Sequence, residues 1–223
     1  MTSNEIKKLF AERIAVFDGA MGSYLQSFGL KESDYAGHDG LNEILSVSRP
    51  DVITKIHEDY LAAGADFIET NTFGANAAVL AGYGLAARVR EFNLASARLA
   101  KAAADKFSKT GRRGFVAASV GPTNKALFVT GGLSFDELRA IYLEQLTALI
   151  DGGADLLLLE TAHDILNLKA GLAAVKLAFR KAGRELPVIV SATMDERNKM
   201  LSGHDAEAFY AAVEHFPLAA LGF

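Results

Sequence analysis

Six short apolar runs alternate with longer helix-forming stretches along the chain, and this alternation constrains the fold more than any other feature of the sequence. Runs such as Leu156–Leu159 and Val188–Val190 are apolar at every position. Strands that helices cover on both faces need this pattern, and such strands belong to parallel sheets. The sequence therefore predicts an α/β fold in which strands and helices follow one another.

The predicted strands cover residues 14–19, 66–70, 114–123, 155–161, 186–194 and 218–223, and the predicted helices cover 49–64, 87–107, 134–153, 164–183 and 204–216. Local signals support the helix ends. Pro50 suits an early helical position and Gly64 suits a helix end. Ser134 with Glu137 three residues later forms a capping box, and Asp164 is a candidate N-cap.

Two α/β architectures satisfy this order of elements, an open doubly wound sheet and a closed barrel. The segments 62–73 and 151–163 resemble each other, since both contain Gly-Ala-Asp, an apolar strand and Glu-Thr. This self-similarity fits repeated βα units. Polar residues cluster after nearly every strand. In an open sheet they would gather at the one point where the strand order reverses, so the pattern favours a (β/α)₈ TIM barrel. We expect a single domain over residues 1–223, with a long connection at 29–43.

Composition excludes several classes of protein. The net charge is −4, which argues against nucleic acid or an anionic membrane surface as a partner. The chain has no cysteine, so it can contain neither a disulfide nor a cysteine-based zinc site. No apolar stretch is long enough for a membrane span, and the charged start does not resemble a signal peptide. We expect a soluble cytoplasmic protein.

Polar clusters at five strand ends are the candidate site: Asp18–Gly22, Glu69–Gly74, Ser119–Asn124, Glu160–Asp164 and Ser191–Asp195. Glycines in the first cluster let backbone N–H groups approach an anion. Each cluster also has a structural explanation, as a tight turn or as the cap of the next helix. The sequence alone leaves both explanations open.

Glu160 is the most informative of these residues because it follows four leucines and therefore lies where a buried strand reaches the rim. A carboxylate there needs a cationic partner or hydrogen bonds. The ammonium group of a substrate would supply one, and an internal Lys or Arg is the alternative. No two histidines have the spacing of metal ligands on a helix, so the sequence contains no complete metal site.

Together the strand ends resemble one family. The motifs DGAMG, ETNTFGAN, SVGPTN, LLLETAHDILNLKA, TMDERNKMLSGHD and LGF occur here in the order and spacing of the homocysteine S-methyltransferases. The segment from Arg49 to Asn76 is especially similar to the cobalamin-dependent methionine synthases. The resemblance extends from about Arg13 to Phe223.

The resemblance implies a (β/α)₈ barrel that binds homocysteine at the C-terminal rim of its strands. Zinc would ionise the homocysteine thiol, which would then accept a methyl group to give methionine. Metal coordination is an effective activator because a free thiol is mostly protonated at neutral pH. In the methionine synthases the donor is methylcobalamin, so cobalamin- and folate-binding modules of the same chain or a partner chain are the implied partners.

The resemblance also assigns roles to individual residues. Asp18 and the turn Gly19, Ala20, Met21 and Gly22 resemble the part of the site that meets the amino acid's carboxylate, with the N–H groups of the turn as donors. Glu160 resembles the residue that holds the substrate's ammonium group. Asn71, Thr72 and Thr123 resemble residues that line the rim of the same pocket.

The zinc ligands are where this chain departs from the family. The family uses three cysteines after the sixth and eighth strands, and this chain has none. We therefore expect an incomplete barrel of about six βα units, with the last two units and the cysteines beyond Phe223, and an inactive fragment. A smaller departure is Asn198, where relatives often have Gly; Asn tolerates the same left-handed backbone.

Three other functions remain open. The first is a stand-alone homocysteine methyltransferase that uses S-methylmethionine or betaine as donor. The second is a non-catalytic truncated barrel that binds a small amino acid or a partner chain. The third is a different barrel enzyme with Glu69 and Glu160 as acid and base.

Overall fold

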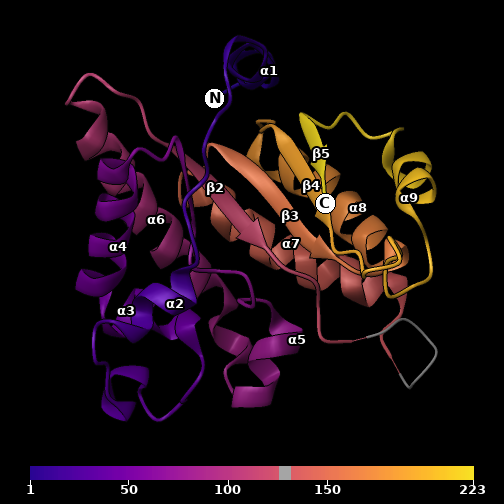
Figure 1. Ribbon diagram of the computed structural model, residues 1–223. Helices are drawn as coiled ribbons and strands as arrows, with labels where there is room; N and C mark the ends of the chain where they lie inside the picture. The colour runs from indigo at the N-terminus through magenta and orange to yellow at the C-terminus, as the bar shows by residue number, and fades with distance from the viewer. Residues whose placement is uncertain (126–131) are drawn as a thin grey trace.

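The computed structural model describes residues 1–125 and 132–223, and within them the chain forms an α/β fold around one parallel sheet (Figure 1). The helices are α1 (Ser3–Glu12), α2 (Met21–Gln26), α3 (Leu45–Ser48), α4 (Pro50–Ala63), α5 (Ala77–Leu80), α6 (Val89–Ser108), α7 (Phe135–Asp151), α8 (Ile165–Ala182) and α9 (Ala206–Val213). The strands are β1 (Phe67–Glu69), β2 (Phe115–Val120), β3 (Leu156–Ala162), β4 (Val188–Ala192) and β5 (Ala220–Gly222).

All strands of the sheet are parallel and stand in chain order, β1-β2-β3-β4-β5. An open doubly wound sheet reverses its strand order at a switch point, and no reversal occurs among these strands. The order therefore agrees with the barrel-like architecture that the sequence favours. The described residues contain a five-stranded sheet, so a count of six complete βα units remains a prediction.

The predicted strand over residues 14–19 is wrong as a regular strand. This segment makes only an isolated parallel bridge between Phe17 and Phe67. The reason is that side chains replace part of the ladder. The N–H of Val16 donates to the Asp66 carboxylate at 2.9 Å, and the N–H of Glu69 donates to Asp18 Oδ2 at 2.9 Å. The segment still lies beside β1 and continues the parallel order.

The long helices confirm the local signals in the sequence. Pro50 opens α4, and Gly64 ends it with φ 119°. Ser134 and Glu137 form the predicted capping box of α7, and the Asp164 side chain accepts from the Asn167 N–H at the start of α8. The predicted helix over 204–216 is shorter at both ends, because α9 begins after its N-cap Asp205 and ends at Val213, before its C-cap Glu214. Helix α1 was not predicted, although Thr2 and Glu5 form a capping box at its start.

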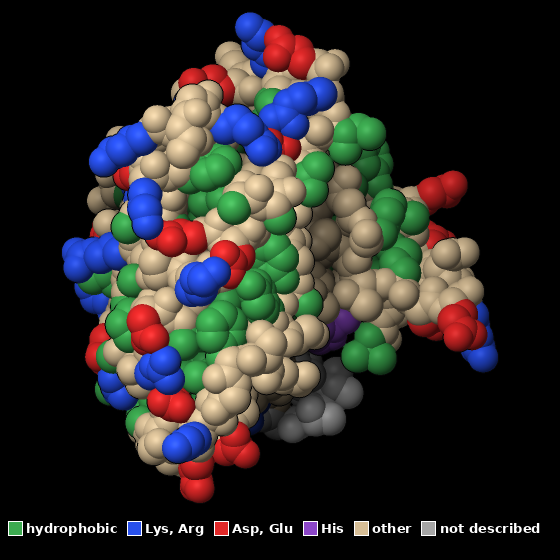
Figure 2. Space-filling view, turned by 60° about the vertical axis from the view of Figure 1, so that its left-hand side comes forward, with side chains coloured by type: hydrophobic (Ala, Val, Ile, Leu, Met, Phe, Trp, Pro, Cys, Tyr) green, Lys and Arg blue, Asp and Glu red, His purple; other side chains and the backbone are tan. Residues whose placement is uncertain are grey.

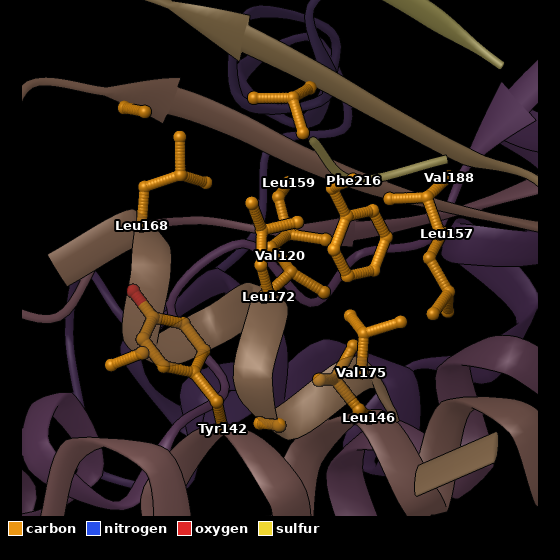
Figure 3. Close-up of a cluster of buried hydrophobic side chains, with 14 of the residues drawn as sticks. Val120, Tyr142, Leu146, Leu157, Leu159, Leu168, Leu172, Val175, Val188 and Phe216 are labelled. Carbon is orange, nitrogen blue, oxygen red and sulfur yellow. The ribbon is translucent and has the colours of Figure 1, made fainter. Parts of the chain in front are cut away.

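Helices α6, α7 and α8 follow one another along one face of the sheet (Figure 1). Figure 3 shows the core between this face and the helices, where Leu157, Leu159 and Val188 from the strands meet Tyr142, Leu146, Leu172 and Val175 from α7 and α8. The side chains of this core are buried from water, which supplies the main driving force for folding. This core fixes the strands from which the rim residues project.

The opposite, inner face of the sheet carries its own apolar cluster. Phe67, Phe115, Leu156, Leu158 and Ile189 pack there. Ile6 of α1 joins this cluster and is fully buried, so α1 covers the end of the inner face at which the strands begin. The other end of the inner face, at the carboxyl ends of the strands, is left for polar residues.

Candidate functional site

Side chains alternate between the two faces of a strand, and this alternation brings polar residues together above the inner apolar cluster. Glu69 follows Phe67 on the inner face of β1, and Ser119 follows Ala117 on that of β2. Glu160 follows Leu158 on that of β3. The three polar residues therefore lie at the carboxyl ends of neighbouring strands, where parallel α/β folds bind their ligands.

A cavity of about 270 Å³ opens at these strand ends. It is lined by Asp18, Gly19, Ala20, Met21, Glu69, Thr70, Asn71, Thr72, Phe73, Ser119 and Glu160. A cavity of this size approaches the lower end of small-molecule sites. A larger cavity of about 600 Å³ lies at the opposite end of the sheet, beside Ser3 and Phe216, away from the strand-end carboxylates.

Seven of the nine residues predicted for the site line the strand-end cavity, namely Asp18, Gly19, Ala20, Met21, Asn71, Thr72 and Glu160. Gly22 and Thr123 do not line it. Gly22 lies in the first turn of α2, where a Cβ would approach Asn42 at 3.6 Å. The roles of all nine residues stay predictions.

Thr123 belongs to a separate buried network. Its hydroxyl accepts from the Asn167 side-chain amide at 2.8 Å, and its N–H donates to the Tyr142 hydroxyl at 3.3 Å. The Tyr142 hydroxyl donates in turn to the Asn167 carbonyl oxygen. Thr123 borders a neighbouring cavity of about 310 Å³ together with Lys125 and Asn167. These contacts join the end of β2 to α7 and α8. The order of the sequence motifs did not predict them.

Three carboxyl groups share the strand-end cavity. Burial raises the pKa of Asp18 to about 7, and the charge of Glu160 adds to this effect. Burial raises the pKa of Glu69 to about 8, with further contributions from Glu160 and Asp18. Burial also raises the pKa of Glu160, while the hydrogen bond that Ser119 Oγ donates to Glu160 Oε1 opposes the shift.

The described lining of the cavity does not balance the charge of these carboxyl groups. No Lys, Arg or His is present among the described residues that line it. Asp18 Oδ1 is buried and has no hydrogen-bond partner within residues 1–125 and 132–223. The internal ion pair that the sequence left open for Glu160 is absent from the ion pairs of the described residues. A buried acceptor without a donor suits a ligand that carries N–H groups.

Asn71 and Thr72 hold the rim together with contacts inside the protein. The Asn71 amide donates to the Asn42 carbonyl at 2.7 Å, and the Thr72 hydroxyl donates to the Ser119 carbonyl at 2.7 Å. Neither side chain caps the next helix, because the Asn76 side chain accepts from the Val79 N–H at the start of α5. The two residues therefore keep the ends of β1 and β2 in place as well as lining the cavity.

The turn after Asp18, from Gly19 to Met21, lines the same cavity. Helix α2 begins after Ala20, which has no side-chain atom that could cap its first N–H groups. Gly19 has a steric reason to lack a side chain, since a Cβ would lie 2.8 Å from the Tyr60 hydroxyl. The Tyr60 hydroxyl donates to the Ala20 carbonyl at 3.3 Å and so holds the turn.

Glu69, Thr70, Phe73 and Ser119 also line the cavity. They belong to the polar strand-end clusters predicted from the sequence, but the family resemblance assigned no role to them. A signal for two of these residues exists in the sequence. Glu69 and Ser119 continue the inner-face alternation of Phe67 and of Phe115–Ala117, just as Glu160 continues that of Leu156–Leu158. Counting residues in steps of two along each strand would have selected them.

Residues 1–125 and 132–223 contain no group of His, Cys, Asp and Glu side chains that could hold a metal ion. No helix within these residues is long and apolar enough to span a bilayer. Lys and Arg alternate with Asp and Glu over the visible surface in Figure 2, without one gathered basic region on that face. That face does not have the electrostatic footprint of a nucleic-acid site.

Known proteins resemble this chain along most of its length. The family model described as Homocysteine S-methyltransferase matches residues 15–223. The methionine synthase of Mycobacterium tuberculosis is 38% identical over 218 residues, which are 98% of this chain and 18% of that protein. The methionine synthase of Mycobacterium leprae gives the same identity and coverage, 38% over 98% of this chain and 18% of its own length.

A solved structure also has a similar fold. The homocysteine methyltransferase MmuM from Escherichia coli, in its metallated form, superposes with a TM-score of 0.79 at 26% identity. The match covers 97% of this chain and 76% of that one. The parallel sheet with its flanking helices is thus similar to the fold of a homocysteine methyltransferase.

Proposed function

The chain belongs to the homocysteine S-methyltransferase family, and from this premise we propose that its strand-end cavity binds homocysteine as the acceptor of a methyl group. The observation that carries the proposal is a cavity with three carboxyl groups, whose lining, among the described residues, contains no cation. An α-amino acid carries an ammonium group with three N–H donors. Asp18 Oδ1, which is buried without a partner in the described structure, and Glu160 are the proposed acceptors.

The carboxylate of the amino acid would bind to the turn from Gly19 to Gly22. Backbone N–H groups at the start of α2 are donors for an anion, and Ala20 offers no side chain that competes for them. Asn71 and Thr72 are proposed to shape the adjoining wall. In this arrangement the chain's own residues bind and orient the amino-acid end of the substrate, which leaves its thiol end free for activation.

Zinc and methylcobalamin are part of the proposal only for a larger protein. The chain spans 18% of the length of the methionine synthases that it matches. Its described residues do not fit a zinc site, since the chain has no cysteine and residues 1–125 and 132–223 contain no other cluster of metal ligands. We propose that zinc is held by residues outside these 223 and that methylcobalamin and folate bind to other modules.

Glu160→Gln tests the role of the cavity. The substitution removes the charge but keeps the size of the side chain, and a hydrogen bond to a charged group contributes about 1.5–3 kcal/mol. We expect homocysteine affinity to fall about tenfold to a hundredfold in isothermal titration calorimetry. Glu144→Gln, on the exposed side of α7, is the matched control. Equal affinity of wild type and Glu160→Gln would contradict the proposal.

A stand-alone homocysteine methyltransferase with a small methyl donor is the second candidate, and the similarity to MmuM over 97% of the chain favours it. Assays of the full-length protein with methylcobalamin, S-methylmethionine and betaine would separate the two candidates. Methionine formed only with methylcobalamin supports the synthase type. Homocysteine binding without transfer from any donor would support a non-catalytic binding protein instead.

A further inference from the structure

A β-bulge interrupts β3 at the rim of the cavity. Leu159 pairs with Val190 and Ala162 pairs with Ala192, so two residues of β3, Glu160 and Thr161, lie opposite the single residue Ser191. Bulges place one extra residue in a strand and are common next to functional sites, where they redirect a side chain. Glu160 is one of the two residues in this bulge.

Thr161 adopts a left-handed backbone conformation with φ 57°. A β-branched residue rarely occupies this region, because its side chain crowds the backbone there. The surrounding contacts must therefore hold it in place. They do so on both sides of Thr161. Ser119 Oγ donates to Glu160, and the Ala162 carbonyl accepts from the Thr193 N–H at 2.9 Å.

The extra residue changes which face of the sheet each side chain meets. Leu158 packs in the inner cluster, and Glu160 lines the inner cavity. Without the bulge the next inner residue would be Ala162. Instead Ala162 packs in the outer core with Val190 and Ala192. Thr161 is the single residue between Glu160, which faces the inner cavity, and Ala162, which packs in the outer core. The change of face therefore takes place at Thr161, and the chain continues from there toward α8.

We infer that Thr161 is a positioning residue, whose left-handed backbone in the bulge fixes the Glu160 carboxylate in the cavity before the substrate's ammonium group arrives. The inference rests on the proposed function of this cavity. A β-branched residue disfavours the left-handed region, so the contacts on both sides of Thr161 hold this conformation and, with it, the bulge. A carboxylate that is already held in its binding geometry loses less conformational entropy on binding.

The test is a double-mutant cycle with homocysteine, measured by isothermal titration calorimetry. Thr161→Pro cannot adopt the left-handed conformation, because its ring fixes φ at about −65°. We expect affinity to fall about threefold to tenfold, which corresponds to the cost of immobilising one side chain. In the Glu160→Gln background the same substitution should leave affinity unchanged, because no carboxylate remains to be positioned. A merely structural role would weaken binding equally in both backgrounds, which would overturn the inference.

Three further variants keep the inference falsifiable. Thr161→Asn and Thr161→Gly adopt the left-handed region more readily than threonine, so the bulge is kept and we expect affinity within about twofold of wild type. If Thr161→Pro does not fold, Thr161→Ile, whose larger branched side chain is more crowded in the left-handed region, should give a smaller loss that also disappears beside Glu160→Gln. Wild type that does not bind homocysteine would overturn the proposed function. Binding that needs Glu160 but is unchanged in Thr161→Pro would overturn only this inference.

Discussion

At the residue scale, the carboxyl groups of Asp18 and Glu69 connect the cavity to the stability of the fold. Their pKa values of about 7 and about 8 arise mainly from burial, which disfavours the charged form. In the unfolded chain both groups titrate near their ordinary values of 3.8 and 4.5. The folded protein therefore holds more protons than the unfolded chain between about pH 4 and pH 8.

The sign of the pH dependence follows from this difference. A group with a raised folded-state pKa contributes stability below its unfolded pKa, and this contribution is lost as pH rises through the folded pKa. We expect the free energy of unfolding to fall between about pH 6.5 and 8.5. This window lies above the range in which His57 acts. Burial lowers the pKa of His57 from 6.5 to about 4, so its effect on stability has the opposite sign and falls at lower pH.

Glu69→Gln should reduce the fall in the free energy of unfolding across this window by on the order of 1 kcal/mol. The substitution removes one of the groups that hold a proton and a charge beside Asp18. Urea denaturation at several pH values across the window measures the effect. Glu144→Gln, which carries the same change on the exposed side of α7, should keep the wild-type slope. Identical slopes for Glu69→Gln and wild type would show that Glu69 does not hold a proton in the folded state.

At the element scale, the Asp66 carboxylate binds the segment 13–16 and holds it beside β1. We call this set of contacts the clamp. Asp66 is buried, and both of its oxygens accept from the Arg13 guanidinium at 2.7 Å. Asp66 also accepts from the Val16 N–H at 2.9 Å, which is the contact that replaces part of the strand ladder. The Arg13 hydrogen bond lowers the pKa of Asp66 to about 2. This clamp keeps Asp18, two residues after Val16, at the rim.

Asp66→Asn should destabilise the protein by about 2–4 kcal/mol at pH 7, because it removes the charge that satisfies Arg13 and Val16. Chemical denaturation measures the loss. The stability that Asp66 contributes is present above its ordinary pKa of 3.8 and is lost as pH falls toward about 2, so the variant and wild type should converge in acid.

Asp105→Asn is the control for this clamp, since Asp105 forms only an exposed pair with Lys101 on α6. Exposed pairs contribute about 0–1 kcal/mol. An Asp66→Asn variant no less stable than Asp105→Asn would mean that the clamp does not hold the segment.

At the scale of the whole molecule, the proposed function separates substrate orientation from thiol activation. The described residues form a strand-end cavity lined by three carboxyl groups and contain no cluster of metal ligands. We expect the 223-residue chain, after incubation with zinc and dialysis, to retain far less than one zinc ion per molecule in elemental analysis. A longer chain that carries the family's cysteines is the positive control. Tight, stoichiometric zinc in the present chain would overturn the proposal that its ligands lie elsewhere.

The sequence by itself determined the features that depend on near neighbours. Ser134 and Glu137 are three residues apart, and so are Asp164 and Asn167, so the starts of α7 and α8 were predictable from local chemistry. The apolar strands and their polar ends indicated a parallel sheet with a rim site. The family motifs then selected seven residues that do line the cavity.

Only the tertiary structure decided the features that depend on residues distant in the sequence. Asp66 and Asp18 replace the strand ladder across about fifty positions, which no local pattern reveals. Thr123 turns to Tyr142 and Asn167 instead of the cavity because α7 and α8 pack beside it. The bulge at Thr161 exists only in relation to the register of β4. Propensity and spacing act within a few residues, whereas register, burial and a carboxyl group's pKa are set by the partners that folding brings together.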